Sequence, residues 1–162
     1  MKKRAIFATR TDAGIHDLAL ALLNGGHELL TGDHAGRIIA SSGLPATPIE
    51  FATRQSKLLG GRAATLHYSL HAGIAGDFTN ERERSAMQRA QIAPVDVVVA
   101  QLPQSAAELG EDPLQALGST NQAAVIALLQ SAASRYSRVC ALVDPNDFGD
   151  VGGGDRLGLC PG

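Results

Sequence analysis

Apolar and polar positions in the first third of the chain alternate between strand-like and helix-like periods. A short apolar run comes first, and apolar residues then recur at helical spacing until Gly25 and Gly26 end the pattern. The pattern predicts, in order, a strand over 4–9, a helix over 15–23, a strand over 27–30, a helix over 35–42 and an extended piece over 45–51. This order implies parallel strands joined by right-handed crossovers.

The later part of the chain continues the same alternation. A polar helix over 80–92 begins with Asn80 and Glu83 at the spacing of a capping box. Residues 95–102 are a nearly continuous β-branched run, which predicts a central parallel strand buried on both faces. The remaining predictions are a brief helix from Asp112, a helix over 123–134 and a strand over 138–143.

These elements predict an α/β domain over residues 1–148. The glycine-rich, aperiodic residues 149–162 predict a disordered tail or linker. No stretch is apolar for long enough to span a membrane, and the basic start loses its apolar run too soon for a signal peptide. We therefore expect a soluble, cytoplasmic protein.

The stretch over 60–74, GGRAATLHYSLHAGI, has almost no helical or strand period and is rich in polar side chains. Unpatterned polar segments of this kind often carry binding or catalysis on a rigid scaffold. Its candidate residues are Arg62, Thr65, His67 and His71. The alternative interpretation is a surface loop with two solvated histidines.

His67 and His71 lie four residues apart, which would place two metal ligands on one helical face. A metal ion would need a third donor, and neither Glu nor Cys accompanies the pair. We therefore predict no metal and no cofactor. We expect one histidine to be buried and hydrogen-bonded and the other to line a pocket, and we keep both as weak catalytic candidates.

A phosphate site is predicted where loops follow the carboxyl ends of parallel strands. Three segments meet that condition, namely 10–14, 31–34 and the region following Phe51 that includes the stretch over 60–74. Hydroxyls, glycine N–H groups and cations are the donors expected there, from Thr9, Arg10, Thr11, Thr31, Gly32, Arg62, Thr65 and His67. Asp12 and Asp33 would repel an anion unless they cap helices.

Composition narrows the class of partner. A formal net charge of -2 argues against nucleic acid, whose binding domains are strongly basic. The two cysteines do not form a disulfide framework or a metal site. A small phosphorylated ligand remains the expected partner, and we also expect a homodimer.

The motifs RAIFATRTDAG, HELLTG, GGRAATLHYSLHAGI, IAPVDVVVAQL and VCALVDPNDF resemble, in this order, those of the IMP cyclohydrolase domain found at the N-terminus of bifunctional purine biosynthesis proteins. The similarity runs nearly without gaps over residues 4–148. It implies a methylglyoxal-synthase-like fold in three layers, with a five- or six-stranded parallel sheet and helices on both faces. It also implies a phosphoribosyl carboxamide as ligand, closed to a purine ring with loss of water.

The sequence departs from that family at four positions associated with ring closure. Ala64 and Ser134 stand where the family has lysines, Pro103 where it has a tyrosine, and Gln122 where it has an aspartate. None of the four residues present exchanges protons near neutral pH. Losing even one electrostatic stabiliser typically lowers a rate by on the order of 10²–10³.

Three hypotheses follow from the resemblance and its departures. The chain is an enzyme with acid and base groups at new positions, a binding module for a nucleotide or partner, or a relic that has kept only the fold. New acid or base residues converging on the pocket would favour the enzyme. An intact cationic phosphate site would favour the module, and acidic side chains filling the phosphate loops would favour the relic.

Overall fold

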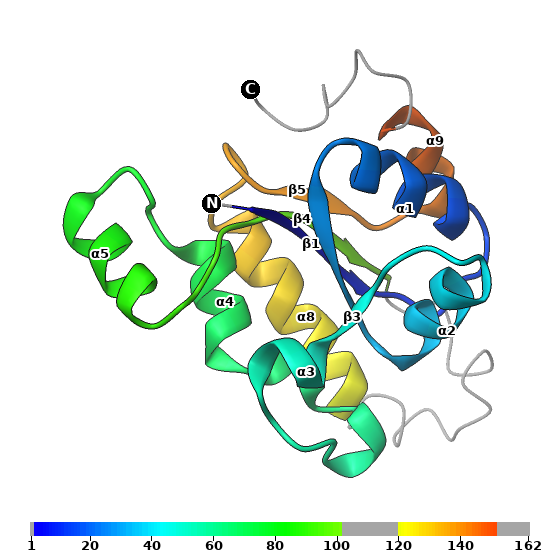
Figure 1. Cartoon of the computed structure of the whole chain (residues 1–162), viewed down its shortest axis with the longest axis horizontal. Helices are drawn as coiled ribbons and strands as arrows, with labels where there is room; N and C mark the ends of the chain where they lie inside the picture. Colours follow the sequence, from blue (N-terminus) through cyan, green and yellow to red (C-terminus); the bar gives the residue numbers. More distant parts are fainter. Residues whose placement is uncertain (1, 102–119, 152–162) are drawn as a thin grey trace.

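A computed structural model describes residues 2–101 and 120–151 as one parallel sheet surrounded by helices (Figure 1). The strand order is β3-β2-β1-β4-β5, so the crossover connections leave from both sides of β1. The strands are β1 Lys3–Ala8, β2 His27–Thr31, β3 Thr47–Pro48, β4 Val95–Ala100 and β5 Cys140–Leu142.

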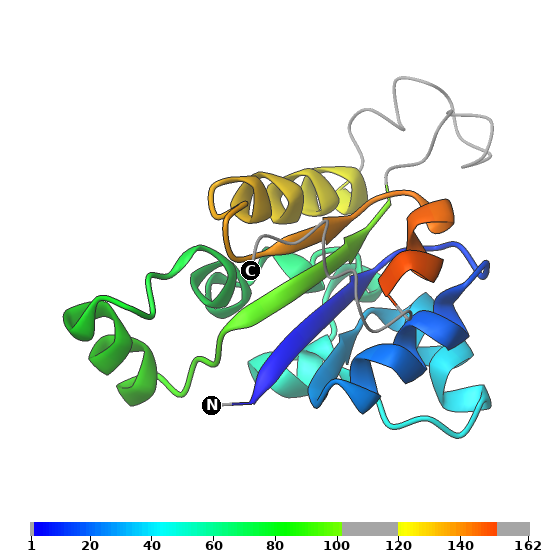
Figure 2. The same ribbon diagram turned by 90° about the horizontal axis from the view of Figure 1, so that it is seen from above.

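Helices cover both faces of the sheet, as Figure 2 shows from above. The α-helices are α1 Ile15–Asn24, α2 Asp33–Ser41, α3 Ile49–Thr53, α4 Tyr68–Ala75, α5 Glu81–Arg89, α8 Thr120–Ala133 and α9 Phe148–Val151. The 3-10 turns are η1 Leu59–Gly61, η2 Ala64–Leu66 and η3 Pro145–Asp147. In the described part of the chain, no helix is both long and apolar enough to cross a bilayer.

The central strand β1 supplies two separate cores because successive side chains of a strand point to opposite faces. Ala5 and Phe7 pack with α1, α2 and α9, whereas Ile6 packs with α3, α4 and α8. All three side chains are fully buried. The predicted three-layer α/β fold with a parallel sheet is therefore confirmed, with five strands.

Two predicted elements have a different structure. Of the extended piece over 45–51, only Thr47–Pro48 pairs with β2, and the chain enters α3 at Ile49. Ile49 is buried while Phe51 is 80% exposed, so burial in this segment does not follow a strand period. The stretch over 60–74 is also largely helical, since η2 and α4 lie within it. Its helical period is hidden because Gly73, a buried position of α4, carries no apolar side chain.

Several boundaries follow from local chemistry. Asn80 caps α5 by accepting from the N–H groups of Arg82 and Glu83, but the Glu83 carboxylate accepts from the Asp77 N–H instead of completing a capping box. Phe148 is 3% exposed and packs on Gly14. The chain therefore stays in the fold through Val151, beyond the predicted start of the tail at 149, and the rest of the tail and the helix expected from residue 112 lie outside the described residues.

Candidate functional site

The three predicted loops lie together at the carboxyl edge of the sheet. The loop after β1 is joined to the start of α2, because the Asp12 carboxylate pairs with Nε2 of His34 at 2.7 Å. The stretch at residues 60–62 reaches the same helix, since a Cβ placed on Gly61 would lie 3.4 Å from Oδ2 of Asp33. We call this region, formed by the loops 10–14, 31–34 and 60–62, the carboxyl edge.

Hydroxyl groups shape the first loop of the carboxyl edge. The Thr9 hydroxyl donates to Oε1 of Gln101 at 3.2 Å and accepts from the Thr11 N–H at 3.3 Å. The Thr11 hydroxyl accepts in turn from the Ala13 N–H at 3.2 Å. Arg10 projects from this loop, exposed and without a hydrogen bond or ion pair to any described residue. The loop therefore presents a cation beside a preformed turn.

The second loop uses its predicted groups differently. The Gly32 N–H donates to the Phe7 carbonyl at 2.9 Å, so it is not available to a phosphate. Thr31 is buried against α2, where a Cβ on Gly36 would come within 2.8 Å of its hydroxyl oxygen. The donors left at this edge are the N–H groups of the first turn of α2, which have no intrahelical acceptor.

A lysine that the sequence reasoning missed also reaches the carboxyl edge. The Lys57 ammonium pairs with the Asp33 carboxylate, and both lie beside Gly61 together with Glu50. Neither Asp12 nor Asp33 makes a helix-capping hydrogen bond. Lys57 is the only lysine in the sequence after Lys3. This isolated position is the sequence feature that could have identified it as a candidate.

Arg62 lies directly after Gly61 and is exposed. Its Nε donates to the Leu59 carbonyl at 3.0 Å, which fixes the base of the side chain within its own turn. Gly60 and Gly61 have φ values of 64° and 84°, a region that glycine adopts without steric strain. Within the described part of the chain, the terminal nitrogens of Arg62 bind no carboxylate.

His71 is held inside the fold. Its Nε2 donates to the Thr65 carbonyl at 3.0 Å, which assigns the ring proton to that nitrogen, and Nδ1 accepts from the Ser131 hydroxyl at 2.8 Å. Both ring nitrogens are thus engaged, so His71 is a bridge between η2 and α8 rather than a proton acceptor. Thr65 is itself buried.

His67 lies apart from the carboxyl edge. It caps α4 by accepting from the Ser69 N–H at 3.2 Å, and it lines a cleft shared with Arg4, near the start of β1. Arg10, after the end of β1, is six residues further on, roughly 20 Å along an extended strand. His71 is therefore hydrogen-bonded within the fold but only partly buried, and His67 lines a cleft. No metal-binding cluster of His, Cys, Asp or Glu occurs among the described residues.

The four positions that the resemblance predicts to depart from the family pattern do not share one place. Ala64 lines a cavity of about 50 Å³ together with Glu50, close to the carboxyl edge. Gln122 lies in the first turn of α8, whereas Ser134 follows the end of that helix, about 18 Å further along its axis. Pro103 lies outside the described residues.

The chain is similar in sequence to bifunctional purine biosynthesis proteins and in structure to ForH. No protein-family model matches the sequence. The bifunctional purine biosynthesis protein PurH of Chloroflexus aurantiacus is 31% identical over 160 residues, which covers 98% of this chain and 31% of that protein. PurH of Anoxybacillus flavithermus is 29% identical over 150 residues, covering 91% of this chain and 29% of that protein.

The structural comparison agrees with the sequence comparison. The crystal structure of ForH superposes with a TM-score of 0.76 at 25% identity, and the match covers 98% of this chain and 82% of ForH. The chain spans about a third of the length of the curated relatives it matches. The resemblance predicted from the motifs is confirmed: this chain is similar to the N-terminal region of the bifunctional purine biosynthesis proteins, a purine biosynthesis domain related to IMP cyclohydrolase.

Proposed function

We propose that this chain binds a phosphorylated purine-pathway nucleotide, a phosphoribosyl carboxamide or a purine mononucleotide, at its carboxyl edge. The observation that carries the proposal is the meeting of three loops there, through the Asp12–His34 pair and the approach of Gly61 to Asp33. Ligands of open parallel sheets bind beyond the carboxyl ends of the strands.

The donors of the carboxyl edge suit a phosphate group. The first-turn N–H groups of α2 and the partial positive charge of its N-terminus favour an anion. Along the chain, Arg10 precedes α2 and Arg62 follows it. Both have free guanidinium nitrogens, which form strong charge-assisted hydrogen bonds to phosphate. The Thr11 hydroxyl adds a neutral donor.

The carboxylates of this edge are held in pairs that rearrange at small cost. In the Asp33–Lys57 pair both side chains are about half exposed, and in the Asp12–His34 pair the carboxylate is 77% exposed. Exposed ion pairs of this kind stabilise a protein by only about 0–1 kcal/mol. A phosphate dianion at the start of α2 would therefore draw Lys57 away from Asp33.

Binding without the usual ring closure is the function that these residues support best. The side chain of Ala64, where the related domains have a lysine, has no group that transfers a proton or stabilises an anion. A second candidate is ring closure with new groups. Cε of Lys57 and Oε1 of Glu50 would lie 3.2 and 3.3 Å from a Cβ placed on Gly61, so both side chains lie close to this loop. Their placement would supply one cation and one carboxylate beside the ligand.

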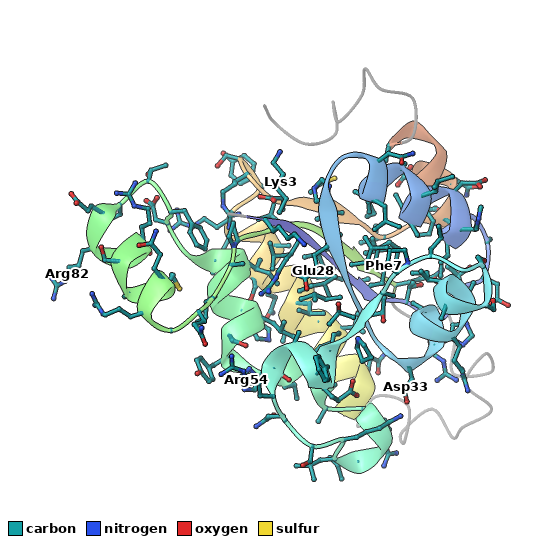
Figure 3. The ribbon with its side chains drawn as sticks, viewed as in Figure 1. Lys3, Phe7, Glu28, Asp33, Arg54 and Arg82 are labelled. Carbon is teal, nitrogen blue, oxygen red and sulfur yellow. The ribbon has the colours of Figure 1, made fainter. Side chains whose placement is uncertain are left out.

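Calorimetry with inosine 5′-monophosphate tests the binding site. Arg62→Ala should weaken binding at least about tenfold, since the phosphate loses a principal cation. Arg82→Ala is the matched control, because Arg82 is also exposed but lies on α5, away from Asp33 and the carboxyl edge (Figure 3). Unchanged affinity in Arg62→Ala would remove Arg62 from the site.

A turnover assay separates the two candidates. The purified chain is given the formylated phosphoribosyl carboxamide, and formation of inosine monophosphate is followed by absorbance. Binding with no turnover supports the binding domain. Turnover that disappears in Lys57→Ala while binding persists supports the second candidate.

A further inference from the structure

A cleft of about 360 Å³ lies near the start of β1, between α3, α4 and the segment that joins α5 to β4. Its apolar lining includes Leu30, Leu70 and Val95, which are buried side chains of the core. Polar and basic side chains complete the lining. The exposed lining is mostly polar, and the volume lies within the roughly 300–1,000 Å³ that is typical of small-molecule sites.

Three donors of the cleft lining keep hydrogen-bonding capacity. Arg4 donates through Nε to Glu28 at 2.8 Å, and Arg54 donates through one terminal nitrogen to Oε1 of Gln91 at 3.0 Å. Among the described residues, the other guanidinium nitrogens of both arginines have no acceptor. Nδ1 of His67 accepts from the Ser69 N–H, so its ring proton lies on Nε2, a further donor.

The charge of this group is positive. Glu28 balances Arg4, but Arg54 meets an amide rather than a carboxylate. Figure 3 places Arg54 between α3 and α4, well away from Asp33 at the start of α2. One guanidinium charge is thus left without an anion at the cleft.

The backbone at the rim gives a second, independent observation. Arg54 and Gln91 both have a φ of 57° and follow the ends of α3 and α5, where glycine is the usual residue. A left-handed conformation is strained for a residue with a Cβ, and strained residues of this kind gather at binding sites. The sequence keeps two long polar side chains at these positions, and they bond to each other across the rim.

We propose that this cleft is a second binding site, for a small organic anion with a carboxylate or phosphate group. The anionic group binds Arg54 and the free nitrogens of Arg4 and His67, and the body of the ligand lies against the exposed ring of Tyr68. The Arg54–Gln91 hydrogen bond closes the rim in the free protein and opens when Arg54 turns to the ligand. This site is independent of the nucleotide site proposed at the carboxyl edge.

Nuclear magnetic resonance on the ¹⁵N-labelled full chain tests the proposal with four probes, namely inorganic phosphate, ribose 5-phosphate, succinate and inosine 5′-monophosphate, each up to about 10 mM. At least one probe should cause saturable shifts of the Ser69 and Gln91 amides. Arg54→Gly should weaken that binding about tenfold or more. Because glycine is favoured at φ 57°, this variant removes the guanidinium without straining the fold.

Arg62→Ala is the cross-control, since it alters the carboxyl edge and leaves the cleft intact. Shifts at Ser69 and Gln91 that persist in Arg62→Ala and vanish in Arg54→Gly establish the second site. Shifts confined to Asp33, His34 and Gly61 would overturn it while supporting the nucleotide site. No shift at Ser69 or Gln91 with any probe, or equal affinity in Arg54→Gly, would also overturn it.

Discussion

The carboxyl edge and the cleft are two polar regions of one domain that differ in how their basic side chains are paired. At the edge, the carboxylates of Asp12 and Asp33 pair with His34 and Lys57, while the guanidinium ends of Arg10 and Arg62 bind no carboxylate of the described residues. In the cleft, Arg54 faces the amide of Gln91, and no acidic residue lies in the cleft lining. The region that resembles a known site is thus the one in which carboxylates lie beside the basic groups.

This difference shows why position in a motif does not by itself locate a functional group. His67 belongs to the most specific part of the family resemblance, yet it faces the cleft. Lys57 belongs to no motif, yet its ammonium lies at the start of α2. The contact between Gly61 and Asp33, which no local pattern encodes, decides which loop residues share a site.

The largest predicted effect is on the scaffold of the cleft. A Cβ on Gly73 would lie 2.7 Å from the Ala93 carbonyl oxygen and 3.2 Å from Cγ2 of Val95. Backbone cannot rotate away as a side chain can, so Gly73→Ala should lower the free energy of unfolding by about 2–3 kcal/mol. Urea denaturation at constant m-value measures this loss.

Gly149→Ala is the matched control because a Cβ there meets nothing within 4 Å. Its stability should stay within about 0.5 kcal/mol of the wild type. The folded fraction of Gly73→Ala should still bind inosine monophosphate with unchanged affinity, since the carboxyl edge lies elsewhere. Equal stability of the two variants would contradict the close packing of α4 on β4.

The sequence predicted the scaffold well because β1 and β4 are apolar on both faces, which only a central parallel strand explains. It failed at α3, a five-residue helix too short to establish a period. It also failed at Gly73, where close packing removes the apolar side chain that would mark the helix. The ion pair of Lys57 with Asp33 depends on long-range folding and could not be predicted from spacing.

A matched pair of glycine variants sharpens the contrast between the two regions. Arg54 has a φ of 57°, whereas Arg62 has a φ of -63°. Arg54→Gly should raise the free energy of unfolding by about 0.5–1 kcal/mol, because it relieves left-handed strain and loses one exposed hydrogen bond. Arg62→Gly should lower it by a similar amount, since glycine loses more backbone entropy there. The same sign in both thermal melts would contradict the strain at Arg54.

The Asp33 carboxylate at the carboxyl edge should weaken anion binding, and this effect should be smaller than the changes in stability predicted above. Asp33→Asn removes a like charge from the start of α2 and frees Lys57, so the affinity for inosine monophosphate should rise about threefold at low salt. Calorimetry at two ionic strengths measures the gain, which should shrink as salt screens it. Asp17→Asn, at an exposed position of α1, is the control and should change nothing. A lower affinity in Asp33→Asn would show that this carboxylate supports the site.

The smallest predicted effect concerns the turn that leads into α5, the helix whose end carries Gln91. The hydroxyl of Thr79, followed by its N–H, donates to the Asp77 carboxylate and lowers the pKa of Asp77 below its ordinary value of 3.8. A pKa lowered on folding means that the charged form stabilises the native state. This contribution is complete above about pH 4 and is lost as the pH falls through the lowered pKa. Urea denaturation from pH 7 to pH 2 measures the free energy of unfolding of the wild type relative to that of Asp77→Asn. This difference should fall only at the acid end of the range. A difference that does not depend on pH would contradict the role of the Thr79 bonds.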